Sequence, residues 1–328
     1  MDNPIEARQV PEVRQNLVED LFRIGPEQML RFIRDHPTDA RLLEASARET
    51  SELTEQELAA YLTVETIKRV RDAELFYVSD AMTEVAVAAG ASLPAFRLMP
   101  EDLPAPQGFI VWGSPIAWAK RDPREAPVVA ASWAPDGDAV GVSFYYDHTE
   151  TALYTQVIEK GGAYLRGHRN MFGVGRLSMT SEAVFTFREE PDWTGLDFGE
   201  DTRPEDMGYL ESLGRTMIAT WLLASQEIAT EERLDPDRGT RRRLERQGAV
   251  VQPIRLLTLR RARRPGRAEP LGAEPGRNYH HQWVVRGHWR NHWFPSRQDH
   301  KPIWIAPYIA GPEDAPLIGA ERVNVLRR

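Results

Sequence analysis

Histidine and arginine gather in one short stretch of the chain. Five of the eight histidines lie between residues 280 and 300, in the segment YHHQWVVRGHWRNHWFPSRQDHKPIWI. Side chains of a strand alternate between two faces, so the even positions bring four residues onto one face at intervals of about 6.6–7 Å. These residues are Arg286, His288, Arg290 and His292. Arginine stabilises phosphate charge and histidine exchanges protons near neutral pH, so the row suits a phosphodiester.

The same row has two other interpretations that the sequence leaves open. A basic strand face also forms where a strand covers an acidic neighbour. A metal site is the other alternative, with imidazoles from His288, His292 and His300 and with Asp299 nearby. His288 and His292 would stand about 13 Å apart on a regular strand, too far for one ion without a bulge. We therefore expect no metal and no other cofactor.

The odd positions of the segment form an apolar face. Tryptophan occupies positions 283, 289 and 293, and another tryptophan follows at 304. Exposed tryptophans stack on nucleic-acid bases, but the parity of the strand favours a core position for the first three.

A second basic stretch precedes this segment. Eleven arginines and a single acid, Glu245, lie between Arg238 and Arg267. From Arg238 to the end there are 19 basic and 7 acidic residues, against 22 and 42 in the remainder. This asymmetry indicates either an anionic partner or docking of the basic part on the acidic body, and a solvated charged face is the third interpretation. We predict nucleic-acid contacts from Arg238, Arg241, Arg242, Arg243, Arg246, Arg260 and Arg261.

Composition excludes several classes of protein. The 328 residues include no cysteine, which rules out disulfides, a thiolate nucleophile and cysteine-ligated metal. The first twenty residues are charged throughout and lack the apolar core of a secretion signal. The apolar runs at 85–91 and 217–224 are far shorter than the ~18–20 residues that cross a bilayer. We expect a cytoplasmic protein with no membrane contact.

The spacing of apolar residues predicts an α+β protein. Helical spacing covers 26–36, 79–89 and the segment that follows a Thr54/Glu57 capping box, and four prolines interrupt 94–107. A period of two predicts strands at 108–113, 127–134, 139–147, 152–159 and 182–188. A helix over about 207–228 and strands at 251–260, 280–293, 302–309 and 322–327 follow.

These elements suggest three regions. We expect a helical N-terminal region at 1–93, an antiparallel β region at 94–200 and a basic α+β module at 201–328. The last would pack one helix on a four-stranded antiparallel sheet. In the alternative of an interaction protein, the acidic helical N-terminus would engage a host protein.

The C-terminal hundred residues resemble a family of uncharacterised actinobacterial, actinophage and plasmid proteins. The resemblance rests on HQWVVRGHWR at 281–290, on IWIAPY at 303–308 and on Gly311-Pro312, and extends to LPAFRLMPEDLPAPQGF at 93–109. It implies a phage or mobile-element context and supplies no catalytic residues.

The order of a helix and then four antiparallel strands is also similar to the barnase/RelE-like ribonucleases, which cleave RNA without metal. That likeness implies a carboxylate base, for which Glu245 and Glu321 are the candidates here. We therefore expect a nucleic-acid-acting protein, with RNA favoured over DNA and metal-independent endoribonuclease activity as the specific hypothesis. In that hypothesis Arg286 and Arg290 clamp the phosphate and His288, with His292, transfers protons. The alternative is a non-enzymatic adaptor or regulator that binds nucleic acid or protein.

Overall fold

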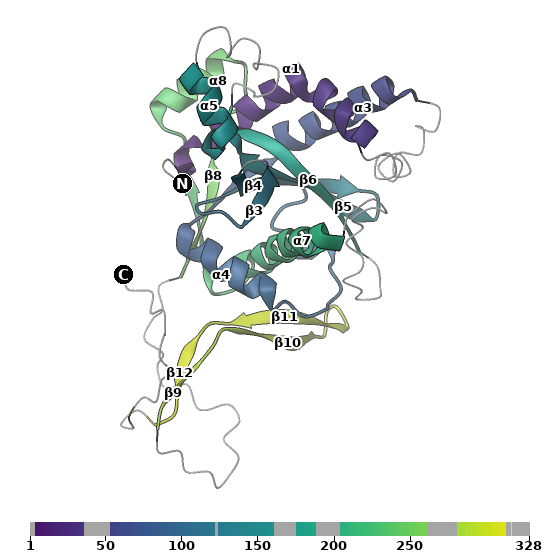
Figure 1. The fold of residues 1–328 in the computed structure, drawn as a ribbon. Coiled ribbons are helices and arrows are strands. Elements are labelled where there is room, and N and C mark those ends of the chain that lie inside the picture. The colour runs from purple at the N-terminus through teal and green to yellow at the C-terminus, as the bar shows by residue number, and fades with distance from the viewer. Residues whose placement is uncertain are drawn as a thin grey trace.

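A computed structural model shows one large mixed sheet between two helical layers, with a two-stranded ribbon beneath the lower layer (Figure 1). The structure describes residues 4–35, 53–121, 124–160, 175–187, 204–260, 281–312 and 316. The predicted α+β class is confirmed. Within the described residues, no helix is long and apolar enough to span a membrane.

Three long helices and one strand form the first part of the chain. The helices are α1 (Val10–Asp35), α3 (Glu55–Arg71) and α4 (Asp80–Ala91), and a short 3-10 helix, η1 (Ala7–Gln9), precedes them. The capping box before α3 is confirmed, because the Thr54 backbone donates to Glu57 Oε2 at 2.9 Å and the Glu57 backbone donates to Thr54 Oγ1 at 3.4 Å. The predicted helical spacing missed β1 (Glu74–Val78), whose apolar run LFYV lacks alternation because both faces of the strand are covered.

The central sheet combines parallel and antiparallel pairs. Its order is β6-β5-β4-β2-β1-β8-β7, and β3 pairs with β4 outside that path. β1 lies parallel to both β2 and β8, and the other neighbours are antiparallel, so the expected antiparallel meander is confirmed for β4, β5 and β6. The remaining strands are β2 (Gly108–Trp112), β3 (Ala117–Arg121), β4 (Arg124–Asp136), β5 (Ala139–Asp147), β6 (Leu177–Thr186), β7 (Ala229–Leu234) and β8 (Ile254–Leu259).

The strand predicted at 152–159 is wrong, because this segment is a helix, α5 (Ala152–Lys160). A 3-10 turn, η3 (His148–Glu150), bends the chain as it leaves β5. Thr151 then accepts a hydrogen bond from the backbone of Tyr154 on its Oγ1 at 3.3 Å, which satisfies a free donor of the first helical turn. The local cap therefore overrides the β-branched composition of the segment.

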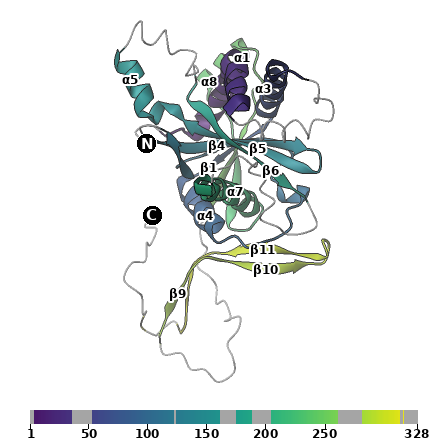
Figure 2. The same cartoon turned by 45° about the vertical axis from the view of Figure 1, so that its right-hand side comes forward.

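Helices cover both faces of the sheet. α1 and α3 pack on one face, against Leu75, Phe109, Val111 and Tyr145 among others. α4 and α7 (Pro204–Ala224) pack on the other face, where Trp221 meets Trp133 edge-on at 5.6 Å between ring centroids. Alternate residues of β1 and β2 serve the two clusters, which is the period of two expected of a strand. Figure 2 shows the same layers after a 45° turn.

The C-terminal strands are distributed over the fold. β8 joins the central sheet, while β9 (Trp283–Val285) pairs with β12 (Tyr308–Ala310), and β10 (His288–Phe294) pairs with β11 (Asp299–Ile305). Antiparallel pairing of the predicted strands 280–293 and 302–309 is confirmed, but each is divided in two, so that they form two separate two-stranded sheets. The arrangement on which the ribonuclease likeness rested, one helix on one four-stranded sheet, does not occur among the described residues. The strand expected at 322–327 lies outside them.

A short helix and an irregular connector complete the description. The basic stretch after Asp237 forms a helix, α8 (Arg238–Arg246), which Asp237 caps by accepting from the backbone of Gly239 and Thr240. The proline-rich connector contains only a 3-10 turn, η2 (Pro100–Asp102), as its prolines predicted. The sheet draws strands from all three of the regions expected from the sequence.

Candidate functional site

The β10–β11 hairpin is held against α4 and α7 by two tryptophans. The indole of Trp289 donates to the carbonyl of Ala89 at the end of α4, at 2.8 Å. The Trp304 backbone donates to the side chain of Gln226 at 2.8 Å, and the two indole rings meet at 5.2 Å between centroids. Trp304 is buried, and Trp289 packs against the same cluster; of these two, Trp289 belongs to the predicted core face.

A buried carboxylate fixes the turn of the hairpin. Asp102 of η2 is fully buried, and its Oδ1 accepts from Arg297 at 2.6 Å and from Lys301 at 2.8 Å. Its Oδ2 accepts from the Met99 backbone at 2.9 Å. Sequence reasoning missed this anchor, because nothing in the local pattern links an acid of the connector to a hairpin 195 residues later.

Three of the four predicted row residues share one exposed face of β10. His288, Arg290 and His292 stand opposite Ile305, Ile303 and Lys301 of β11, and all three row residues are exposed. Arg286 is also exposed, but it lies in the break between β9 and β10 and not on a continuous strand. The Arg286 carbonyl is 3.0 Å from Nδ1 of His288, so Arg286 contacts the first residue of the row on β10.

The row does not serve to dock the hairpin on an acidic neighbour. Four other basic residues of the C-terminal part make those ion pairs: Arg243 with Glu12, Arg255 with Glu74 and Glu231, and Arg297 and Lys301 with Asp102. Across the part of the chain that is described, no carboxylate pairs with Arg286 or Arg290. Their positive charge is therefore turned to solvent without local compensation.

The histidines of the hairpin are not arranged as the metal site considered above would require. His300 stands opposite Trp293 in the hairpin, so it belongs to the other face from His292, which stands opposite Lys301. No group of three His or acidic side chains able to hold a metal ion occurs within the described ranges.

Trp293 corrects the prediction of a uniformly buried odd face, because it is 48% exposed. Pro302 and Trp304 of β11 are buried, and Trp289 of β10 packs against the core cluster. Trp293 lies four residues beyond Trp289 toward the hairpin turn, with its ring 5.1 Å from the His300 ring.

The predicted arginines of α8 lie on the other side of the molecule. Arg243 binds Glu12 of α1 through two contacts of 2.7 and 3.0 Å, so α8 belongs to the α1 layer, while the hairpin lies beyond α4 and α7 (Figure 1). Arg238, Arg241, Arg242 and Arg246 are exposed there, and so is Arg260 after β8. Arg261 and Glu321 lie outside the described residues. Glu245, on α8, is thereby separated from His288, and it does not supply the carboxylate base that a ribonuclease centre at the hairpin would need.

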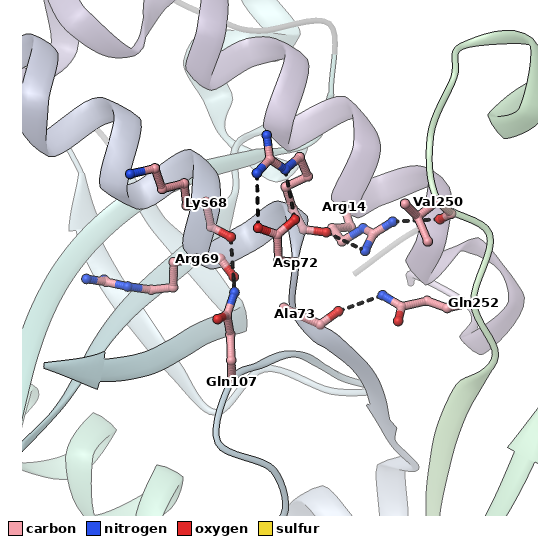
Figure 3. Close-up of polar contacts among 9 residues, drawn as sticks. Arg14, Lys68, Arg69, Asp72, Ala73, Gln107, Val250 and Gln252 are labelled. Atoms are coloured by element: carbon pink, nitrogen blue, oxygen red, sulfur yellow. Dashed lines mark hydrogen bonds and ion pairs between the residues drawn. The ribbon is translucent and has the colours of Figure 1, made fainter.

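Polar contacts of the buried Arg14 and of Gln107 surround the end of α3 (Figure 3). The guanidinium of Arg14 donates to the carbonyls of Arg71 and Val250 at 2.9 and 3.0 Å. Gln107 donates to the last carbonyls of α3, those of Lys68 and Arg69, both at 3.0 Å. Burial lowers the pKa of Arg14 to about 10, which leaves it charged at neutral pH. These contacts satisfy the free carbonyls of a helix end, which is a structural role.

His148 is the one histidine that the described residues bury completely. Its Nδ1 lies 3.0 Å from Ser178 Oγ. Burial lowers its pKa to about 4, against a smaller opposing effect of Asp147 and Asp20, so the ring is neutral at pH 7.

Comparisons with known proteins give limited information. No family model and no curated protein matches the chain. A solved structure described as "Crystal structure of AcrVA2" aligns over 89% of this chain and 93% of its own, at 13% sequence identity and a TM-score of 0.38. A similarity of this size supports no statement about function.

Proposed function

We propose that this protein binds nucleic acid, RNA before DNA, through the exposed row of the β10–β11 hairpin. One observation carries the proposal: Arg297 and Lys301 of the hairpin share the buried carboxylate of Asp102, whereas Arg286 and Arg290 face solvent. Unpaired arginines beside histidines favour an anion with several phosphates, because each guanidinium binds phosphate oxygens in a bidentate fork.

The two-stranded form of the hairpin favours an irregular or single-stranded RNA ligand. A two-stranded ribbon fits the wide major groove of DNA, but the deep major groove of an RNA helix excludes it. RNA would therefore bind as unpaired strand or loop, where phosphates and bases are both accessible. We further propose a mobile-element context for this function, because the hairpin segment resembles actinobacterial, actinophage and plasmid proteins.

The geometry supports binding better than cleavage. Metal-independent cleavage needs two proton-transferring groups at one phosphate. His288 and His292 are four residues apart on β10, about 13 Å along a strand. The one acid of the hairpin, Asp299, stands opposite Phe294 at the far end of β10 from His288, and its Oδ1 accepts from the His300 backbone at 2.7 Å. His288 therefore stands beside Arg290 without a second acid or base next to it. Endoribonuclease activity at His288 is the narrower hypothesis that the experiment below includes.

The first test measures binding as a function of salt. Fluorescence anisotropy with single- and double-stranded RNA and DNA compares the wild type with the Arg286→Ala/Arg290→Ala variant. Each lost phosphate contact should lower the log–log salt slope by about 0.7 for a single strand and about 0.9 for a duplex. Arg31→Ala, an exposed arginine of α1 on the other side of the sheet, is the matched control. A double variant with the wild-type affinity and slope refutes the proposed site.

A second arm separates binding from cleavage and from the adaptor alternative. The wild type and His288→Ala are incubated with the same RNA in EDTA. We expect bound, intact RNA in both samples; cleavage that disappears in His288→Ala would instead establish the ribonuclease hypothesis. A wild-type salt slope near zero would favour a protein-binding adaptor.

A further inference from the structure

We propose that α8 is a second nucleic-acid surface, and that the protein holds two nucleic-acid segments at once on opposite sides of its sheet. This inference rests on the function proposed for the hairpin. It adds that binding is bivalent, and that the second segment is held by a row of arginines on a helix.

The exposed side of α8 carries a regular row of positive charge. Arg238, Arg242 and Arg246 follow one another at intervals of four residues, and Arg241 stands beside them. Residues four apart on a helix are neighbours at about 5–6 Å, so the row repeats its charge once per turn. The inward positions are Thr240 and Leu244, both buried, so packing fixes the row to the outer side.

The row has no compensating charge in the described structure. Arg243 alone pairs with a carboxylate, that of Glu12, and Arg246 donates only to the backbone carbonyl of Arg242 at 3.2 Å. Glu245, the single acid of the helix, forms no ion pair within the described residues. Like charges four residues apart destabilise a helix, whereas a merely solvated face gains from alternating signs. The row thus costs stability unless an anion covers it.

A linear polyanion fits this row better than a single anionic group. Three charges in line, one per helical turn, match the dense and regular charge of a nucleic-acid backbone. α8 also presents them from its exposed side and not from its amino end, where Asp237 already accepts the free backbone donors.

The layer order prevents one short ligand from reaching both surfaces. From top to bottom in Figures 1 and 2 the order is α8 with α1, the sheet, α4 with α7, and the hairpin. Neighbouring layers are about 10 Å apart, so roughly 30 Å separate the α1 layer from the hairpin. A stem of about eight base pairs is only about 27 Å long at 3.4 Å per pair, and most of the molecule lies between the two surfaces.

A bridging assay tests the inference. One stem-loop of about eight base pairs, with a single-stranded tail, is fixed to beads, and a second, labelled copy is captured through the protein. The wild type should retain the label. The Arg238→Ala/Arg242→Ala/Arg246→Ala variant keeps the Arg243 contact with α1, and we expect it to bind the beads but to lose most of the label.

Two controls distinguish the possible outcomes. Replacing the same three arginines by lysine keeps the charges and should restore capture, which excludes loss of folding as the cause. Mass measurement in solution checks that all variants share one oligomeric state, since a dimer with a single site per chain would also bridge.

The inference fails if the triple alanine variant captures the label as well as the wild type does, or if the wild type binds beads without capturing label. The second result leaves the hairpin proposal intact. By contrast, undiminished bead binding by an Arg286→Ala/Arg290→Ala variant that also carries the three α8 changes would refute the hairpin proposal itself.

Discussion

Charged residues in this protein differ sharply in whether an opposite charge lies beside them. Asp102 holds two cations in a buried contact, while Arg290 has no carboxylate in the described part of the chain. The alternation of β10 predicted the exposed row, because parity depends on neighbouring residues alone. The Asp102 contacts with Arg297 and Lys301 depend on tertiary packing and have no sequence signal. The exposed residues of the row were thus easier to predict than the buried residues that hold the hairpin on the body.

His148 gives a prediction for the pH dependence of stability. Its folded pKa of about 4 lies below the value near 6.5 that it regains on unfolding, so the unfolded chain binds the proton more readily. The stabilising contribution of neutral His148 is present above pH 6.5 and is lost as the pH falls toward 4. Between pH 7 and pH 5 this amounts to about 2 kcal/mol of unfolding free energy.

Urea denaturation at the two pH values measures this loss. The His148→Gln variant cannot titrate at this position, so its unfolding free energy should change by about 2 kcal/mol less than that of the wild type over the same interval. An equal loss in both proteins would show that other groups cause the pH dependence.

At the scale of elements, patterns of local origin were predicted well and long-range pairings were not. The strand at 139–147 and the capped start of α3 follow from alternation and from a side-chain cap, and both are confirmed. β1 was missed because a strand that is covered on both faces does not alternate between apolar and polar residues. The segment of α5 was mistaken for a strand because its helical conformation follows from the Thr151 cap and not from its composition. β8 lies in the central sheet and the hairpin lies outside it. This difference depends on which strand each segment pairs with, and composition does not encode such long-range pairing.

The contact between α4 and α7 gives a prediction at this scale. The helix predicted at 79–89 continues to Ala91, and a Cβ at position 90 would lie 2.9 Å from the Thr216 backbone of α7. Gly90→Ala must therefore separate the helices, and we expect a loss of about 1–3 kcal/mol.

Gly208 of α7 is the matched control, because a Cβ there meets nothing within 4 Å. Gly208→Ala should stabilise by up to about 1 kcal/mol, the helix propensity difference. Urea unfolding of both variants measures the contrast; a neutral Gly90→Ala would mean that the helices are free to separate.

At the scale of the whole molecule, the sheet makes distant parts of the chain depend on one another. β1 comes from the first ninety residues, yet it lies between β2 and β8, and its Leu75, Phe76 and Val78 are buried. We predict that a fragment of residues 1–93 does not fold by itself, because those side chains and both strand edges would be exposed. Far-UV circular dichroism against urea tests this, and a cooperative helical transition in the fragment would contradict it.

The pairing of β1 with β8 also sets an order of events during synthesis. Leu75 pairs with Ile254, so one edge of β1 lacks its partner until 179 further residues have been made. At about 5–20 residues per second the ribosome needs roughly 9–36 s for that length. Throughout this interval an apolar strand edge of the nascent chain is open to other chains, so the yield of native protein should depend on translation speed and on chaperones that cover β1.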